Sequence, residues 1–297
     1  MRIGFDIGGT KTEVCVLDHK GTTIFTQRVP TPSNYERFLE AIVDLISIAE
    51  NSTATSTSIG IGLPGAISPA TGLIKNSNCT FLNGTDLKRD LQNKLGRPLH
   101  LANDANCFTL SEAVDGVGKN RNVVFGAILG TGCGGGIVVN QKLLVGPNAV
   151  SGEWGHNPLP HYIEKQDGPP RVCYCGKSNC IEQYISGTGL QLSYKSLSGE
   201  NISAEDIIAR YEEKESNAVT CYNTLIDQMA RSFAAIVNVL DPDVIVLGGG
   251  LSNVMSLYRD LPEATSKYVF SDSANIRFEQ AKFGDSSGIR GAAWLAL

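Results

Sequence analysis

The chain has 297 residues, of which 42% are hydrophobic, 19% charged and 7% aromatic, and this is enough apolar material for one large domain or two ordinary ones. Lys and Arg total 25 against 30 Asp and Glu, so the net charge of −5 argues against a protein that binds nucleic acid through phosphate contacts. Glycine is the outlier, with 32 residues, which is typical of many tight turns or of backbone close to a ligand.

The ends of the chain and its cysteines indicate a compartment. The segment Met1–Asp6 lacks the long apolar stretch of a signal peptide, and no apolar run is long enough to cross a bilayer. The chain is therefore expected in the cytoplasm, without a membrane as partner. Eight cysteines in such a chain favour reduced thiols and a metal site over disulfides.

Hydrophobic patterning predicts an α/β protein. Strands are predicted over residues 3–17 (interrupted by a glycine turn), 22–29, 58–62, 98–102, 122–129, 137–140 and 243–247. Helices are predicted over residues 35–49, 87–95, 104 to about 114, 222–240 and 287–297. Ser33 and Glu36 form a capping box that is expected to begin the first of these helices.

Residues 122–140 resemble residues 3–17, because both read as strand, glycine turn and strand. Such an internal repeat predicts two related halves with a cleft between them. The boundary is expected near residues 115–119. One domain would then cover residues 1–116, with the final helix 287–297 packing back on it, and the other residues 117–286.

Three glycine-rich turns follow predicted strands, at Gly8–Lys11, Gly130–Gly136 and Gly248–Gly250. Glycines let backbone N–H groups approach an anion closely, and the carboxyl end of a strand is where α/β sheets bind nucleotides. Asp6 is suited to orient a hydrated Mg²⁺ beside phosphates. The competing interpretation of the first turn is an ordinary hairpin. None of the three is a Walker A loop or a Rossmann fingerprint.

Asn103 and Asp104 lie between a predicted strand and a predicted helix. Taken alone, Asx residues at such a position favour a helix cap. If Asp104 lies opposite phosphate-binding loops, its carboxylate could instead accept the proton of a sugar hydroxyl that attacks a γ-phosphoryl group.

His156 and three clustered cysteines, Cys173, Cys175 and Cys180, supply the four N and S ligands of a tetrahedral structural zinc. The C-x-C arm is tighter than the usual C-x₂-C, and the alternative is a set of free thiols. Glu153 and Glu182 flank this cluster and offer carboxylates for sugar hydroxyls, although either one singly would pass for a surface glutamate.

Taken together, these motifs resemble the ROK family of bacterial sugar kinases and sugar-responsive repressors. The likeness covers most of the chain in the family's order and is nearest to the bacterial fructokinases (manno(fructo)kinases). The motifs that carry it are Asp6–Lys11, Gly62–Gly65, Leu101–Asn106, Gly130–Gly132, Gly152–His156, Cys173–Glu182 and Leu247–Gly250.

The resemblance implies an actin/hexokinase-like fold, with ribonuclease H-like duplicated domains around a cleft. It also implies ATP, Mg²⁺ and Zn²⁺ as cofactors and a free hexose that is phosphorylated at its 6-hydroxyl. By this likeness Asp104 is the general base, and the sugar is held by Gly65, Asn103, Asp104, Glu153, His156 and Glu182. ATP is expected at Asp6, Gly8, Gly9, Thr10, Lys11, Gly130, Thr131, Gly132, Gly134, Gly248 and Gly249. Zinc is expected on His156, Cys173, Cys175 and Cys180.

One feature strains this scheme, because His156 cannot give the same nitrogen to zinc and to sugar. Its second ring nitrogen would have to face the sugar. Fructose is expected as the substrate on overall likeness alone, with glucose and N-acetylhexosamines as alternatives. A homodimer is implied by the family.

Two other function classes compete with the kinase. A sugar-sensing repressor needs a DNA-binding segment, which is expected before a first strand that here begins at Ile3. A nucleotide-driven switch of the actin type leaves Asn103, Asp104 and the glutamates without a purpose.

Overall fold

The computed structural model describes residues 1–53 and 58–296, which divide into two compact units. The first unit holds Met1–Asn120, Gly136–Ser151 and Lys282–Leu297, and the second holds Arg121–Gly135 and Gly152–Ala281. This grouping places residues 136–151 with the first unit, whereas the sequence assigned them to the second domain. Leu297, the last residue of the predicted final helix, lies outside the described residues.

A five-stranded sheet forms the centre of the first unit, in the order β3-β2-β1-β4-β7. Its strands are β1 (Arg2–Ile7), β2 (Lys11–Leu17), β3 (Thr23–Pro30), β4 (Ser58–Leu63) and β7 (His100–Asn103). The hairpin strands β1, β2 and β3 pair antiparallel, and β4 and β7 extend the sheet in parallel. A short hairpin of β5 (Ala66–Ile67) and β6 (Ile74–Lys75) follows β4.

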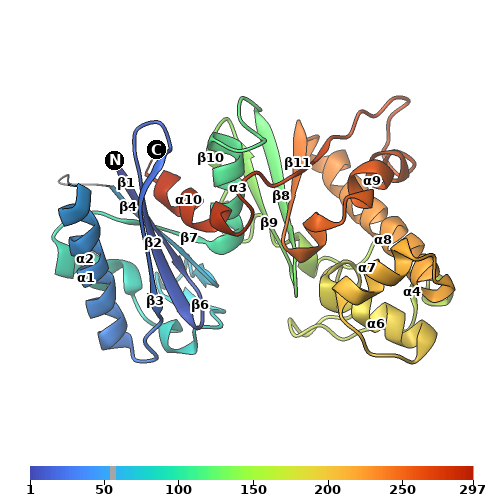
Figure 1. The fold of residues 1–297 in the computed structure, drawn as a ribbon, viewed down its shortest axis with the longest axis horizontal. Helices are drawn as coiled ribbons and strands as arrows, with labels where there is room; N and C mark the ends of the chain where they lie inside the picture. Colours follow the sequence, from blue (N-terminus) through green and yellow to red (C-terminus); the bar gives the residue numbers. More distant parts are fainter. Residues whose placement is uncertain (54–57, 297) are drawn as a thin grey trace. The chain divides into compact units, whose positions relative to one another are not determined.

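Helices α1 (Tyr35–Thr53) and α10 (Ser287–Trp294) lie on opposite faces of this sheet, as Figure 1 shows. Helices α2 (Leu87–Leu95) and α3 (Asp104–Val114) complete the unit. The predicted capping box is wrong by one residue. The side chain of Asn34, not Ser33, accepts a hydrogen bond from the backbone N–H of Arg37 at the start of α1.

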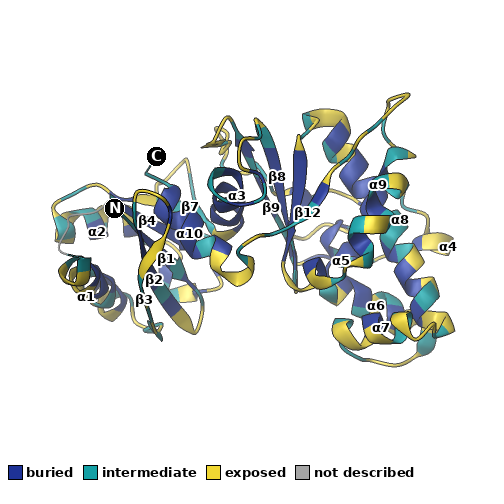
Figure 2. Cartoon of the chain, turned by 45° about the horizontal axis from the view of Figure 1, so that its top comes forward, coloured by how far each residue is buried: buried dark blue, intermediate teal, exposed yellow. Residues whose placement is uncertain are grey.

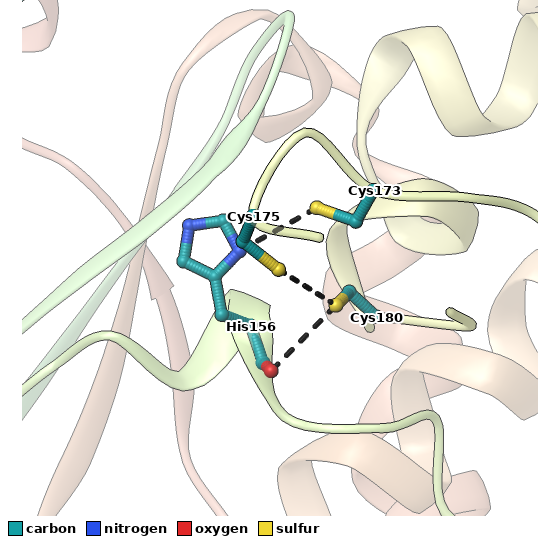
Figure 3. Close-up of side chains that lie close together, drawn as sticks. All are labelled: His156, Cys173, Cys175 and Cys180. Carbon is teal, nitrogen blue, oxygen red and sulfur yellow. Dashed lines mark hydrogen bonds between the residues drawn. The ribbon is translucent and has the colours of Figure 1, made fainter. Parts of the chain in front are cut away.

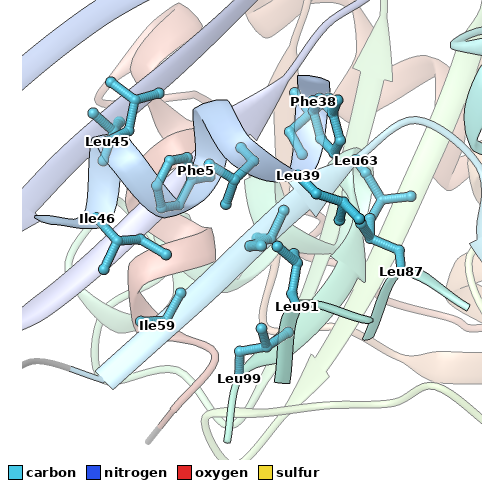
Figure 4. Close-up of a cluster of buried hydrophobic side chains, with 14 of the residues drawn as sticks. Phe5, Phe38, Leu39, Leu45, Ile46, Ile59, Leu63, Leu87, Leu91 and Leu99 are labelled. Carbon is cyan, nitrogen blue, oxygen red and sulfur yellow. The ribbon is translucent and has the colours of Figure 1, made fainter. Parts of the chain in front are cut away.

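The core of the first unit fills the face of the sheet that α1 covers. Phe5, Phe38 and Ile42 are fully buried there, and Figure 4 shows the cluster. The stripe predicted for residues 35–49 supplies the buried residues of α1. Burial of this apolar surface stabilises the sheet against the helix.

Helix α10 approaches the other face so closely that the strands beneath it need glycine. A Cβ on Gly4 would lie 2.2 Å from the carbonyl oxygen of Ile289, and one on Gly60 would lie 1.8 Å from that of Ala292. Nearly all of α10 is buried (Figure 2). The end of the chain is therefore an integral part of the first unit.

The second sheet has the order β10-β9-β8-β11-β12. Its strands are β8 (Val123–Leu129), β9 (Cys133–Val139), β10 (Lys142–Leu143), β11 (Val244–Gly248) and β12 (Phe278–Gln280). Strands β8, β11 and β12 are parallel, and β9 and β10 form a hairpin. When the five strands of each sheet are numbered in chain order, both sheets have the spatial order 3-2-1-4-5. The internal repeat predicts this agreement.

The helices of the second unit are α4 (Glu164–Asp167), α5 (Glu182–Ile185), α6 (Gly187–Ser198), α7 (Ala204–Glu212), α8 (Ser216–Leu240) and α9 (Ser256–Ser266). Helix α8 contains the predicted stretch 222–240 and begins six residues earlier, where Glu215 accepts hydrogen bonds from the first backbone N–H groups. Within residues 1–53 and 58–296, no helix has both the length and the apolar character to span a membrane.

Candidate active site

Asn103 joins a strand to a helix in the first unit. It ends β7 and caps α3, since its Oδ1 accepts a hydrogen bond of 2.9 Å from the backbone N–H of Ala105. Its Nδ2 donates to the carbonyl oxygen of Gly65 at 3.2 Å. Gly65 has a φ of +95°, and a Cβ there would lie 2.6 Å from the carbonyl oxygen of Lys75. Glycine is therefore required at the residue that orients the Asn103 amide.

Asp104 is the first residue of α3 and is exposed. Its carboxylate accepts a hydrogen bond from the N–H of Ala105 at 2.8 Å. Asp6, at the end of β1, lies close enough to feel its charge. Burial, and then the negative charge of Asp104, raise the pKa of Asp6 from 3.8 to about 6. The first unit thus brings together the two carboxylates expected for the base and for Mg²⁺.

The turn Gly8–Lys11 joins β1 to β2. The N–H of Gly8 donates to the carbonyl oxygen of Lys11 at 2.9 Å, and the hydroxyl of Thr31 donates to the carbonyl oxygen of Gly8 at 2.8 Å. A Cβ on Gly9 would meet no atom within 4 Å. The tip of this turn is open, and among residues 1–53 and 58–296 no packing contact accounts for the glycine at its centre.

The second and third glycine motifs meet in the second unit. Gly249 follows β11 with a φ of +78°, and a Cβ there would lie 2.6 Å from the carbonyl carbon of Leu129 and 2.8 Å from the nitrogen of Gly130. Gly249 and Gly130 thus place two strand ends side by side. Gly130, Thr131 and Gly132 form the connection between β8 and β9.

The interpretation of Gly130–Gly136 as one long turn is wrong, because β9 already begins at Cys133. Two of its glycines are explained by packing. A Cβ on Gly135 would lie 2.7 Å from Cδ1 of Trp154, and one on Gly136 would lie 2.5 Å from the hydroxyl of Thr109. Only residues 130–132 remain as a loop, and Gly134 lies within the strand.

His156, Cys173, Cys175 and Cys180 converge on one point, and their ligand atoms all lie within 4.8 Å of one another (Figure 3). The sulfurs of Cys175 and Cys180 are 3.5 Å apart, and Nδ1 of His156 is 3.7 Å from the sulfur of Cys173. A tetrahedral zinc with Zn–S bonds of about 2.3 Å separates its sulfurs by about 3.8 Å. The donor set and its spacing therefore fit zinc.

The short loop that carries the cysteines is closed by backbone pairing. The N–H of Cys173 donates to the carbonyl oxygen of Lys177 at 2.8 Å, and the N–H of Asn179 donates to that of Arg171 at the same distance. A hydrogen bond from the backbone N–H of Lys177 lowers the pKa of the Cys175 thiol. Metal ligation needs the thiolate, so this contact favours it.

The two nitrogens of His156 face different groups. Nδ1 points to the cysteine cluster, whereas Nε2 lies 3.0 Å from the hydroxyl of Tyr174 and 4.0 Å from a carboxylate oxygen of Glu153. The two roles expected of His156 thus fall on different nitrogens of the ring. One nitrogen is available for a metal and the other lies beside Glu153, which is exposed.

Glu182, in contrast, is buried at the start of α5. Its Oε2 accepts a hydrogen bond of 2.9 Å from the backbone N–H of Cys133. A Cβ on Gly132 would lie 2.7 Å from the same oxygen. Glu182 thus supports the glycine loop, a contact that sequence reasoning missed.

Trp154 is a second residue that sequence reasoning missed, although it lies inside the motif Gly152–His156. Its indole N–H donates to the carbonyl oxygen of Gly134 at 3.0 Å. The available signal was a large aromatic residue next to Gly155 within the motif Gly152–His156, in a chain that also contains the glycine run Gly134–Gly136.

Comparisons with known proteins agree with the motifs. The sequence profile of the ROK family matches residues 2–297. An N-acetyl-D-glucosamine kinase of Mannheimia succiniciproducens is 41% identical over 302 residues, which cover 100% of this chain and 99% of that protein. Among solved structures, a ROK hexokinase from Thermus thermophilus is 27% identical with a TM-score of 0.87, over 99% of this chain and 97% of that one.

A ROK family glucokinase from Streptomyces griseus, solved with glucose and AMPPNP, is 26% identical with a TM-score of 0.75, over 98% of this chain and 97% of that one. The expected actin/hexokinase-like α/β fold is thereby confirmed.

Proposed function

The chain belongs to the ROK family and is a sugar kinase of it, and we propose that it transfers the γ-phosphoryl group of ATP to the 6-hydroxyl of N-acetyl-D-glucosamine. The observation that carries this substrate is the 41% identity, end to end, with an N-acetyl-D-glucosamine kinase. This relative supports the alternative of an N-acetylhexosamine over fructose, the substrate expected from the sequence.

In this proposal Asp104 takes the proton of the attacking hydroxyl. Three features support the role: the side chain is exposed, it begins a helix, and it stands near Asp6. Asn103 and Gly65 would hold the sugar beside it, since the amide of Asn103 is already oriented by Gly65. A carboxylate so placed is worth about 10²–10⁴-fold in rate.

Binding of the nucleotide is assigned to the glycine turns. Gly8–Lys11 has an open tip at Gly9, and Gly249 lies beside Gly130, with Thr131 and Gly249 exposed, so the backbone at both places faces solvent. We assign ATP contacts to these residues and to Gly134. Mg²⁺ bound with ATP would neutralise phosphate charge, and Asp6 is the carboxylate suited to orient its waters.

Zinc on the His156 cluster would have four protein ligands and hence a structural role. Its ligands stand next to Glu153 and Glu182, which we assign, together with the Nε2 side of His156, to sugar hydroxyls. The cluster would hold these groups in place without taking part in the reaction.

We also propose, from the family resemblance, that the chain is a cytoplasmic homodimer. Sedimentation of the purified chain would test the oligomeric state.

The test is a coupled assay of ADP release with N-acetyl-D-glucosamine, glucose, mannose and fructose. We expect release that depends on sugar, with the highest kcat/KM for N-acetyl-D-glucosamine. Sugar binding without ADP release would instead support a sugar-sensing regulator. ADP release that ignores sugar would support a nucleotide switch.

A further inference from the structure

Three side-chain and backbone groups from one stretch of the chain hold the glycine loop of the second unit. The N–H of Gly187 donates to the carbonyl oxygen of Gly130 at 2.7 Å. Glu182 accepts from the N–H of Cys133 at 2.9 Å, and Trp154 donates to the carbonyl oxygen of Gly134 at 3.0 Å. The first contact fixes the beginning of the loop, and the other two fix its end.

Two of these contacts come from the arms of the cysteine–histidine cluster. Trp154 lies two residues before His156, and Glu182 lies two residues after Cys180. The arm around Trp154 also touches the loop directly, because a Cβ on Gly155 would lie 2.3 Å from the carbonyl oxygen of Cys133. A ligand that orders the cluster would therefore also order Trp154 and Glu182, which hold the loop.

The indole of Trp154 is fixed on all sides. Its ring packs edge-on against Phe125 at 5.4 Å between centroids, and against Phe233 at 5.0 Å with the ring planes tilted by 33°. On the strand side it lies over Gly135, where any Cβ would stand only 2.7 Å away. A side chain held in this way presents its N–H to Gly134 with little entropy left to lose.

We propose that Trp154 is a positioning residue for the nucleotide: through its hydrogen bond to Gly134, near the start of β9, it sets the conformation of the loop Gly130–Gly132 that precedes the strand and thereby the affinity for ATP. The inference rests on the proposed function, which assigns this loop to ATP. Trp154 is only 3% exposed, so it acts through the loop and does not touch a substrate. Neither the motif nor the family resemblance assigned it a role.

The experiment compares Trp154→Phe with the unchanged chain. Phenylalanine keeps an aromatic ring in the cluster but lacks the indole N–H. Loss of one hydrogen bond predicts a rise of about 3- to 10-fold in the Kd for AMPPNP by calorimetry, and a similar rise in the KM for ATP. The KM for sugar should change by less than about twofold, and the zinc content should not change.

Phe233→Leu is the matched control, because it alters the same aromatic cluster without removing a contact to the loop. It should lower stability and leave the ratio of the two KM values unchanged. Gly135→Ala is an independent second variant, since its methyl group must displace the indole. It should reproduce the selective loss of nucleotide affinity, and it keeps the test decisive if Trp154→Phe does not fold.

A spectroscopic signal separates positioning from a general loss of structure. The chain has two tryptophans, and among the described residues the indole nitrogen of the other, Trp294, has no hydrogen-bond partner. Trp294→Phe therefore leaves Trp154 as the single emitter without removing a hydrogen bond. Its emission should shift on addition of AMPPNP.

The outcomes distinguish the inference from the function on which it rests. An unchanged chain that neither binds AMPPNP nor releases ADP would overturn the proposed function, and the inference with it. An active chain whose Trp154→Phe and Gly135→Ala variants keep the normal Kd for AMPPNP would overturn the inference alone. Equal weakening of sugar and nucleotide would overturn it too, because the role would then be structural only.

Discussion

The two sheets take the same strand order along the chain, but the turns that follow their first strands are supported differently. After β1, the turn Gly8–Lys11 has an open tip and rests on one threonine, Thr31. After β8, the loop from Gly130 is fixed by Trp154, Glu182 and Gly187, all from the segment that carries the cysteine–histidine cluster. The two sheets therefore share their strand order but differ in the residues that support the turn after the first strand.

Charge differs between the sheets as well. Two residues before Gly8 stands Asp6, whereas two residues before Gly130 stands Ile128. Asp104 adds a second carboxylate to the first unit, near enough to raise the pKa of Asp6. In the proposed function, the first unit supplies the groups that take the proton and orient Mg²⁺, and the second supplies a supported loop for the nucleotide.

The largest effect is expected in the first unit, from Asp104→Asn. This change keeps the size of the side chain but removes the base, so kcat should fall by about 10²–10⁴-fold. Calorimetry should show sugar and AMPPNP affinities close to those of the unchanged chain. A variant with near-normal turnover would reduce Asp104 to a residue of the helix cap.

In the second unit the largest effect is expected from Cys175→Ser. If zinc binds the cluster, this change should reduce the metal content below one per chain after dialysis. Stability should fall as well, because a metal a thousandfold above its Kd stabilises the folded state by about 4 kcal/mol. Elemental analysis and urea unfolding measure both quantities. A fully active chain without zinc would contradict the structural role of the cluster.

Two glycine substitutions test where the first unit needs close packing. Gly60→Ala should destabilise the first unit by about 3 kcal/mol or more, since its Cβ would overlap the backbone of α10. Gly9→Ala should change stability by less than about 1 kcal/mol, because open space surrounds it. Urea unfolding of both variants makes the comparison, and equal losses would contradict the packing described for α10.

The effect expected at Asp6 is smaller than that of Gly60→Ala, and it depends on pH. Its folded pKa of about 6 exceeds the usual 3.8, so the folded chain holds the proton more tightly than the unfolded chain. Stability from this group is therefore greatest below about pH 4 and falls as the pH rises to 6, by roughly 2–3 kcal/mol. Asp6→Asn should lack that fall in urea unfolding without Mg²⁺, and parallel pH profiles would contradict the burial of this carboxyl.

The sequence predicted the strands around the glycine turns because runs of β-branched residues end abruptly at glycine. It predicted that His156 and the three cysteines group together, because three cysteines within eight residues favour a shared site. It did not predict α6, which begins with Gly187-Thr188-Gly189, or α9, which contains Pro262. Both sequences are poor helix formers, and the helices are held by packing against α8.

The length of the second glycine turn also could not be predicted from the sequence. Gly135 and Gly136 are explained by Trp154 and Thr109, which lie 19 and 27 residues away along the chain. No local pattern distinguishes a glycine that meets a phosphate from one that meets an indole. The preferred hexose could not be predicted for a similar reason, because the candidate sugars differ by small groups such as one hydroxyl or one acetamido group.

The most direct test of the account is a competition for limiting ATP among equal amounts of N-acetyl-D-glucosamine, glucose and fructose, read by ³¹P NMR of the products. The account predicts that N-acetyl-D-glucosamine 6-phosphate dominates and that inorganic phosphate is scarce. Fructose 6-phosphate as the main product, or ATP consumed without any sugar phosphate, would contradict it.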